Sequence, residues 1–299
     1  MSEIKSVAIA GASGNLGAHV FKALFDANFQ VTVLTRGQKS ETYDLNVKVL
    51  EVDYTSVESL TAALQGQDAV VSTIGGEALE GQTVLIDATI AAGVERFIPS
   101  DFGSVSTNPA LHAYPVYSST AKIQKYLAEK AKTSRLSYTI LASGGSLEDI
   151  LGKISIIDFN KHRAELYDGG DTRISSTSFA NVGKAIAGIL KHPEETKNRV
   201  VHVSQAILTQ NKLLAIAREL RPDIPWELTR VNTMDMMQEA LASIGAGDFS
   251  FPTIIKFVKS TVFAGDRYGA AYDVTDNELL GIDLLTEAEL KKLVADRLG

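Results

Sequence analysis

The feature that most constrains the fold is an alternation, through the first half of the chain, of short apolar runs with segments of helical periodicity. The runs that we interpret as strands span residues 6–10, 31–35, 47–53, 68–74, 96–100 and 137–142. The helices predicted between them span about residues 16–27, 56–64, 82–92 and 118–132. Strands joined by helices form a parallel sheet that helices cover on both faces. The sequence therefore predicts an α/β fold with a Rossmann-type, doubly wound parallel sheet.

The second half of the chain has a different texture. After residue 143 it consists of Gly- and Ser-rich turns, short strands and further helical stretches, among them 180–191, 211–220 and 233–244. We therefore predict a Rossmann domain over residues 1–143. Residues 144–299 are expected to form mainly a smaller α+β substrate-binding domain, with segments that return to the Rossmann sheet.

Charge and composition narrow the classes of partner. The net charge of −7 argues against a nucleic-acid or anionic-membrane surface, because both select basic faces. The chain has no cysteine, which excludes thiolate metal ligands, and its five histidines include no i, i+4 pair, so no metal is expected. The start of the chain resembles no signal peptide, and no apolar run is long enough to span a membrane. We expect a cytoplasmic monomer or homodimer that acts on a small molecule.

The first predicted strand runs directly into the glycine-rich segment "GASGNLG", residues 11–17, which opens the first predicted helix. Gly11 allows a tight turn, Gly14 lets a pyrophosphate approach the backbone, and Gly17 lets the helix pack closely on the sheet. The amides of the turn and of the helix N-terminus would then face one anionic group. The alternative is a glycine-rich turn without a ligand. The residues expected to contact a dinucleotide here are Gly11, Ser13, Gly14, Asn15, Leu16 and Gly17.

The end of the second predicted strand indicates which dinucleotide binds. An NAD-binding protein places a carboxylate there, whereas this chain has Thr35, followed by Arg36 and Lys39. A guanidinium pairs bidentately with phosphate oxygens, so the pattern favours the 2′-phosphate of NADP(H). The alternative is that Arg36 is a solvated loop residue.

The ends of the third, fourth and fifth predicted strands would complete the cofactor crevice. Asp53 is equally well explained as a residue that caps the following helix, for which Thr55 or Ser56 is also a candidate cap. The cofactor-binding residues predicted at these three strand ends are Asp53, Tyr54, Thr73, Ile74, Gly75, Ser100, Asp101 and Phe102.

Five segments together resemble the NmrA-like, isoflavone-reductase-like branch of the atypical short-chain dehydrogenases. They are "GASGNLG" (11–17), "VLTRG" (33–37), "VVSTIGG" (70–76), "RFIPSDFG" (96–103) and "VYSSTAKIQKYLAE" (116–129). The resemblance covers nearly the whole chain. It implies a Rossmann domain that binds NADPH, a smaller substrate domain, and hydride transfer to a phenylpropanoid-like or otherwise conjugated metabolite. The branch also includes regulators that bind the dinucleotide without catalysis, so an NADP(H) sensor is the alternative function.

The catalytic position of the resembling reductases is altered in this chain. They carry a lysine that begins a K-x-x-[IV] element of the helix after the fifth strand, and this position corresponds to Thr120. The nearest lysine is Lys122, which a shift at the helix start could bring into the site. We take Lys122, Thr120 and His112 as catalytic candidates, and expect Lys122→Ala to lower turnover at least ~10²-fold. The alternative is a solvated lysine.

Two tyrosine and lysine pairs imitate the motif of other short-chain dehydrogenases. Tyr126 and Lys130 have the spacing Y-x-x-x-K but lie two turns into the predicted helix, away from the strand ends. Tyr117 and Lys122 are five residues apart, about 140° around a helix, so they would not share a face. We interpret both pairs as chance matches. The loop 104–116 is expected to act as a lid, and residues 143–150 and 245–257 to line the substrate pocket.

Overall fold

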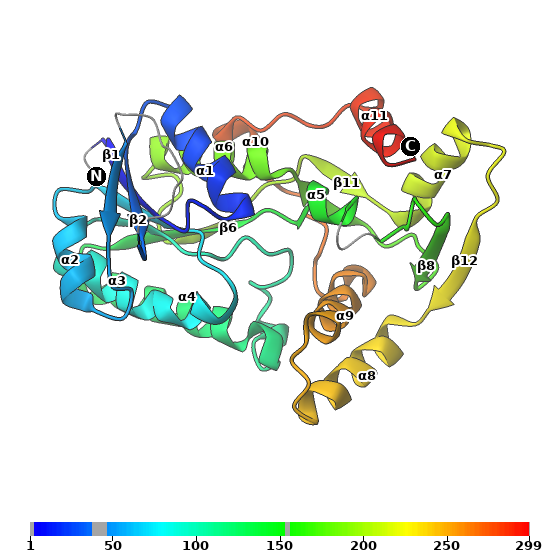
Figure 1. Cartoon of the computed structure of the whole chain (residues 1–299), viewed down its shortest axis with the longest axis horizontal. Helices are drawn as coiled ribbons and strands as arrows, with labels where there is room; N and C mark the ends of the chain where they lie inside the picture. Colours follow the sequence, from blue (N-terminus) through cyan, green and yellow to red (C-terminus); the bar gives the residue numbers. More distant parts are fainter. Residues whose placement is uncertain (1–2, 38–46, 153–155, 299) are drawn as a thin grey trace.

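The computed structural model describes residues 3–37, 47–152 and 156–298. Within these ranges the chain forms a central sheet of seven parallel strands in the order β10-β6-β5-β4-β1-β2-β3. Figure 1 labels β1, β2 and β6 of this sheet. The strands are β1 (Ser6–Ala10), β2 (Gln30–Thr35), β3 (Lys48–Glu51), β4 (Ala69–Ser72), β5 (Arg96–Ile98), β6 (Ser137–Ala142) and β10 (Arg199–His202). The order reverses between β1 and β4, as in doubly wound folds. The predicted α/β fold class is confirmed.

Five of the six predicted strands form because their apolar runs are buried on both faces of a parallel sheet, whereas the residues of the edge strand β3 are exposed or only partly buried. In β1, Val7 lies between Val31 of β2 and Ala69 of β4. The third, fourth and fifth strands each end two residues earlier than predicted, at Glu51, Ser72 and Ile98. The strand β10 was not among the predicted six.

Two layers of helices cover the sheet. One face packs against α2 (Val57–Leu64), α3 (Gln82–Ala91) and α4 (Pro115–Thr133), and the other against α1 (Asn15–Asp26), α6 (Phe179–Lys191) and α10 (Asn277–Leu280). Ser56 caps α2 by accepting a hydrogen bond from the Ser59 amide at 3.1 Å. The helix α4 begins three residues earlier than predicted because Pro115 occupies its first turn, where no amide donor is needed.

The helix α6 belongs to the second half of the sequence but packs in the core of the first sheet. It lies against α1, where a Cβ at Gly183 would be 2.7 Å from the carbonyl oxygen of His19. Val182 and Ile186 are buried in one cluster with Val20 and Leu24 of α1. Residues on both sides of position 143 therefore build the same core.

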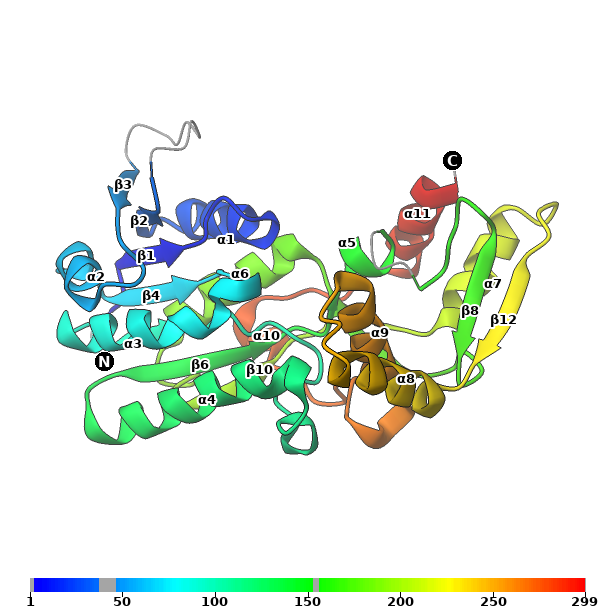
Figure 2. The ribbon, with the colours of Figure 1, turned by 60° about the horizontal axis from the view of Figure 1, so that its bottom comes forward.

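A second core lies beside the sheet's carboxyl edge (Figure 2). It includes the parallel pair β8 (Arg163–Tyr167) and β12 (Glu227–Val231), and a small sheet of β7 (Gly145–Ser146), β9 (Ile174–Thr177) and β11 (Ala206–Leu208). Its helices are α5 (Leu147–Ile150), α7 (Gln210–Leu220), α8 (Thr233–Gly245), α9 (Phe251–Val262) and α11 (Glu287–Leu298). Short 3₁₀ turns are η1 (Gly76–Gly81), η2 (Pro109–Leu111) and η3 (Gly265–Arg267). Across the described residues, no helix combines the length and apolar character of a membrane span.

Candidate functional site

The turn between β1 and α1 holds its three glycines for different reasons. Gly11 has φ +89°, and a Cβ there would lie 2.9 Å from the carbonyl carbon of Thr73. A Cβ at Gly17 would lie 2.0 Å from the carbonyl oxygen of Gly11. Gly14 has an ordinary φ of −77°, and its nearest neighbour for a Cβ is 3.4 Å away. The fold itself therefore requires Gly11 and Gly17, whereas Gly14 faces open space.

The N-terminus of α1 is equipped for an anion. No side chain caps it, and its first turn contains no acidic residue. Ser13, Gly14 and Asn15 are exposed, while Leu16 packs against the core. Free amides at a helix N-terminus bind phosphate groups, so these residues fit the pyrophosphate of a dinucleotide.

The end of β2 places Arg36 at the surface, where both a contact with a 2′-phosphate and the alternative of a solvated loop residue are open to it. Thr35 donates from Oγ1 to the carbonyl oxygen of Gly37 at 2.8 Å and so shapes the turn in which Arg36 is exposed. Tyr54 packs beside it and donates to the carbonyl oxygen of Leu34 at 3.1 Å. Burial raises the pKa of Tyr54 to about 12, against the opposing charge of Arg36. The predicted Lys39 lies outside the described residues.

Two of the predicted cofactor side chains are occupied by the protein itself. The Asp53 carboxylate accepts hydrogen bonds from the amide and hydroxyl of Thr55, at 2.8 and 2.7 Å, and these bonds lower its pKa. Thr73 donates from Oγ1 to the carbonyl oxygen of Ala10 at 2.9 Å, beneath the glycine turn. Asp53 therefore does not cap α2, whose cap is Ser56, and instead holds the turn before that helix. Ile74 packs into the core, and Gly75 is exposed just before η1.

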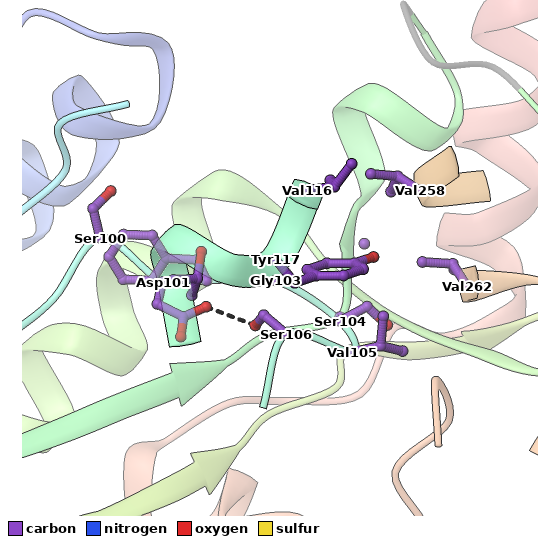
Figure 3. A pocket seen from close by; sticks show the side chains of 14 residues that line it. Ser100, Asp101, Gly103, Ser104, Val105, Ser106, Val116, Tyr117, Val258 and Val262 are labelled. Atoms are coloured by element: carbon purple, nitrogen blue, oxygen red, sulfur yellow. Dashed lines mark hydrogen bonds between the residues drawn. The ribbon is translucent and has the colours of Figure 1, made fainter. Parts of the chain in front are cut away.

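A cavity of about 370 Å³ opens where β5 and β6 end (Figure 3). Its wall comes from the segment after β5, the first turns of α4, the turn after β6, and α9. The lining residues are Ser100, Asp101, Phe102, Gly103, Ser104, Val105, Ser106, Val116, Tyr117, Thr120, Gly144, Gly145, Val258 and Val262. Both halves of the chain therefore contribute to one chamber.

The chamber has a polar wall and an apolar wall. Asp101 and Ser106 belong to the polar wall, where the serine donates from Oγ to the carboxylate at 2.6 Å. Val258 and Val262, one turn apart on α9, belong to the apolar wall (Figure 3). Tyr117 lies against it, with its hydroxyl 2.8 Å from Oγ1 of Thr261, and burial raises the pKa of this tyrosine to about 12. Such a chamber suits a flat apolar molecule that carries oxygen at one end.

The structure places Thr120 in the cavity and Lys122 outside it. Residues two apart on a helix point about 200° apart, so the two side chains leave α4 on different faces. Lys122 is exposed and forms a 3.5 Å ion pair with Glu80 of η1, which also accepts from Ser119. The interpretation of Lys122 as a residue shifted into the site is therefore not supported by the geometry, because the helix runs regularly through both positions.

The remaining candidates have structural partners. His112 lies within 3.2 Å of the Ser106 carbonyl oxygen through Nε2, and it is not among the lining residues. Tyr126 and Lys130 both bind Asp87 of α3, the tyrosine at 2.7 Å and the lysine at 2.7 Å, which links α3 to α4. In the structure, the two residues of that Y-x-x-x-K match hold α4 against α3.

The loop 104–116 is packed rather than open. Leu111 is fully buried, and the side chain of Asn108 donates to the carbonyl oxygen of Tyr268 at 3.1 Å. Ser106 belongs to the loop 104–116, which was predicted to border the site, whereas sequence reasoning missed the two valines of α9. The predicted wall segment 245–257 ends one residue before Val258, so helical periodicity extended past residue 257 could have found them. In the described ranges no cluster of His, Asp and Glu has the arrangement of a metal site.

Comparison with known proteins identifies the family. The model of the NmrA-like family matches residues 3–221, and the chain belongs to this family. The oxidoreductase aprR of Aspergillus flavus is 30% identical over 282 residues, which cover 92% of this chain and 94% of that protein. The crystal structure of isoflavone reductase superposes with a TM-score of 0.77 at 21% identity, covering 97% and 98% of the two chains. A complex of leucoanthocyanidin reductase from Vitis vinifera with NADPH gives 0.72 at 18% identity, covering 98% and 99%.

Proposed function

We propose that this chain is an NADPH-dependent oxidoreductase that reduces a small aromatic or conjugated metabolite. The observation that carries the proposal is the position of the chamber. It lies at the carboxyl ends of β5 and β6, on the same edge of the sheet as the glycine turn. In doubly wound folds this edge is where a dinucleotide and its substrate meet.

The cofactor would be held by residues whose geometry fits it. The exposed amides of the β1–α1 turn face the pyrophosphate, and Arg36 faces the 2′-phosphate. Gly75 leaves the backbone after β4 open to close approach. NADPH supplies a hydride when it is bound. A relative that shares 30% identity and most of its length carries the name oxidoreductase, which supports the same class of reaction here.

The substrate class follows from the two walls of the chamber. Val258, Val262 and Tyr117 offer flat apolar contact for a ring. Asp101, Ser106 and Thr120 offer hydroxyl and carboxyl groups for an oxygen that gains charge as the hydride arrives. A conjugated or aromatic carbonyl compound has both parts, an apolar ring or chain for the first wall and an oxygen atom for the second. The names of the solved neighbours, isoflavone reductase and leucoanthocyanidin reductase, belong to the same chemical range.

The test is a reduction assay. The full chain is incubated with NADPH and a panel that includes cinnamaldehyde, 1,4-naphthoquinone and flavonoid acceptors, and loss of NADPH absorbance is compared with a protein-free blank. We expect at least one conjugated acceptor to be reduced faster than the blank, and saturated aldehydes of the same length to be poor substrates. Reduction of the saturated aldehydes alone would contradict the proposed class.

A second candidate, an NADP(H) sensor without catalysis, is favoured by one observation. The position that resembles the reductases' lysine holds Thr120, and the neighbouring Lys122 lies outside the chamber. NADPH binding with no turnover across the panel would support the sensor.

A further inference from the structure

One carboxyl group of the chamber has a setting unlike that of the other acids discussed. Asp101 follows β5, lines the cavity and is only 6% exposed. Burial raises the pKa of its carboxyl group, since the charged form loses hydration. Hydrogen bonds from Ser106, Gln124 and the Gly103 amide oppose this shift, as does the charge of His112. The net effect is a pKa above the ordinary value of an aspartate.

The two oxygens of this carboxyl group have different neighbours. Oδ2 accepts a hydrogen bond from Nε2 of Gln124 at 2.7 Å. An amide N–H only donates, so this oxygen remains an acceptor. Oδ1 lies 2.6 Å from Oγ of Ser106, the contact drawn as a dashed line in Figure 3. A proton on the carboxyl group is therefore placed on Oδ1, toward the serine.

Ser106 connects that proton with the chamber. It lines the cavity, and its hydroxyl group can reverse its role because a hydroxyl both donates and accepts. When Asp101 is ionised, Ser106 donates to it. When Asp101 is protonated, the carboxyl group donates to Oγ, and the serine's own hydrogen is free to turn toward a molecule in the cavity.

We propose that Asp101 stores the proton for the reduction and that Ser106 delivers it to the oxygen of the substrate. This inference rests on the proposed function. NADPH, when bound, would supply the hydride that forms the new C–H bond while the carbonyl π electrons move to the substrate oxygen. That oxygen takes the proton of Ser106, Ser106 takes the proton of Asp101, and water later reprotonates the carboxylate. Ser106 is then the catalytic residue, and Asp101 acts through it.

The other polar groups of the chamber are less suited to this task. The hydroxyl of Tyr117 is paired with Thr261, and burial holds its pKa at about 12. Thr120 carries the same kind of hydroxyl group as Ser106, but it is Ser106 that lies 2.6 Å from the Asp101 carboxyl group, which can replace a transferred proton. A second ionisable group that faces Asp101 is Tyr272, whose pKa burial also raises, so it stays neutral across the working range.

The first test does not depend on turnover. The infrared carbonyl stretch of a protonated carboxylic acid is recorded for the full chain at about pH 6, where ordinary carboxyl groups are ionised, with and without NADPH. We expect a band in the wild type that is absent from Asp101→Asn and disappears as the pH rises. The variant is expected to keep its Tm, because an amide, like the protonated carboxyl group, is neutral and can accept from Gln124 while it donates toward Ser106. A wild type without the band, or a band that persists in the variant, would overturn the proposal.

The second test separates proton transfer from loop support, using the acceptor in the panel that the wild type reduces fastest. Asp101→Asn and Ser106→Ala should each lower kcat by ~10²-fold or more, whereas Ser106→Thr, which keeps the hydroxyl, should retain most of it. In the wild type, kcat should fall as the pH rises through the pKa of Asp101. Gln124→Met removes a hydrogen-bond donor that stabilises the ionised carboxylate, so the fall in kcat should move to higher pH. Lys125→Ala, on the exposed face of α4, is the control.

If Asp101 only anchors the loop 104–116 to α4, Gln124→Met would mimic Asp101→Asn and the fall in kcat with pH would stay in place. That result would contradict the relay. A wild type without any turnover would count against the proposed reductase function, and the infrared band would still decide whether Asp101 holds the proton.

Discussion

Arg36 follows β2 at the point where a carboxylate would bind the ribose hydroxyls of NAD. Its side chain is exposed, beside Tyr54, and can reach a bound phosphate. A charge-assisted hydrogen bond contributes about 1.5–3 kcal/mol. We therefore expect Arg36→Ala to weaken NADPH binding roughly tenfold to a hundredfold and to leave NADH binding nearly unchanged. Titration calorimetry with both dinucleotides measures this, with Arg218→Ala on α7 as the control. Equal affinity of the wild type for both dinucleotides would contradict the assignment.

Thr120 and Lys122 test the catalytic face of α4. Thr120 lines the cavity, whereas Lys122 pairs with Glu80 at the surface. Thr120→Val keeps the shape and removes one neutral hydrogen bond, worth about 0.5–1.5 kcal/mol, so turnover should fall up to roughly tenfold. Lys122→Ala should now leave turnover within about threefold of the wild type, in contrast to the sequence-based expectation. A large loss in Lys122→Ala alone would show that the ion pair with Glu80 opens during the reaction.

At the scale of the element, different glycines of the β1–α1 turn are expected to serve folding and cofactor binding. A Cβ at Gly17 would lie 2.0 Å from a backbone oxygen, so Gly17→Ala should lower the free energy of unfolding by about 3 kcal/mol or more. Gly14→Ala meets only an ordinary 3.4 Å contact and a normal φ, and the variant should fold as the wild type does. Its methyl group would occupy the space of the pyrophosphate, and NADPH should bind at least tenfold more weakly, about 1.4 kcal/mol. Thermal melts and NADPH titrations of both variants measure these effects. Unchanged NADPH affinity in Gly14→Ala would place the pyrophosphate elsewhere.

The same turn shows why part of the structure could be predicted. The strands β1, β2 and β4 are apolar runs buried on both faces, and the glycine pattern adjoins β1, so local sequence determines both. The strand β10 is four residues long, with polar residues at both ends, and carries no such signal. The chamber depends on longer distances. Ser106 and Val258 line one cavity although they lie far apart in the sequence, and no local periodicity reports such a long-range arrangement. The pairing of Asp53 with Thr55 is local, yet a carboxylate at that position was equally compatible with capping of the next helix and with cofactor binding.

At the scale of the whole molecule, segments from both halves of the sequence build the core around the seven-stranded sheet. The strand β10 forms one edge of this sheet, and the helices α6 and α10 cover one of its faces. All three elements follow residue 143 in the sequence. The buried residues of α6 include Val182, Ile186, Ile189 and Leu190. Each large apolar side chain contributes about 1.5–3 kcal/mol when it is buried, so four of them equal much of a typical domain's stability of about 5–15 kcal/mol.

The predicted division at residue 143 can therefore be tested as a folding unit. We expect residues 1–143 expressed alone to lack a cooperative thermal transition and to bind NADPH weakly, although the glycine turn and Arg36 are present in that fragment. The reason is that the face of α1 that carries Val20 and Leu24 would lose α6 and be exposed to water. Circular dichroism melts and NADPH titrations of the fragment, of the full chain, and of the fragment mixed with residues 144–299 make the comparison. Recovery of a cooperative melt on mixing would support the shared core, whereas a sharp transition and tight NADPH binding by residues 1–143 alone would show that the Rossmann unit is independent of α6 and β10.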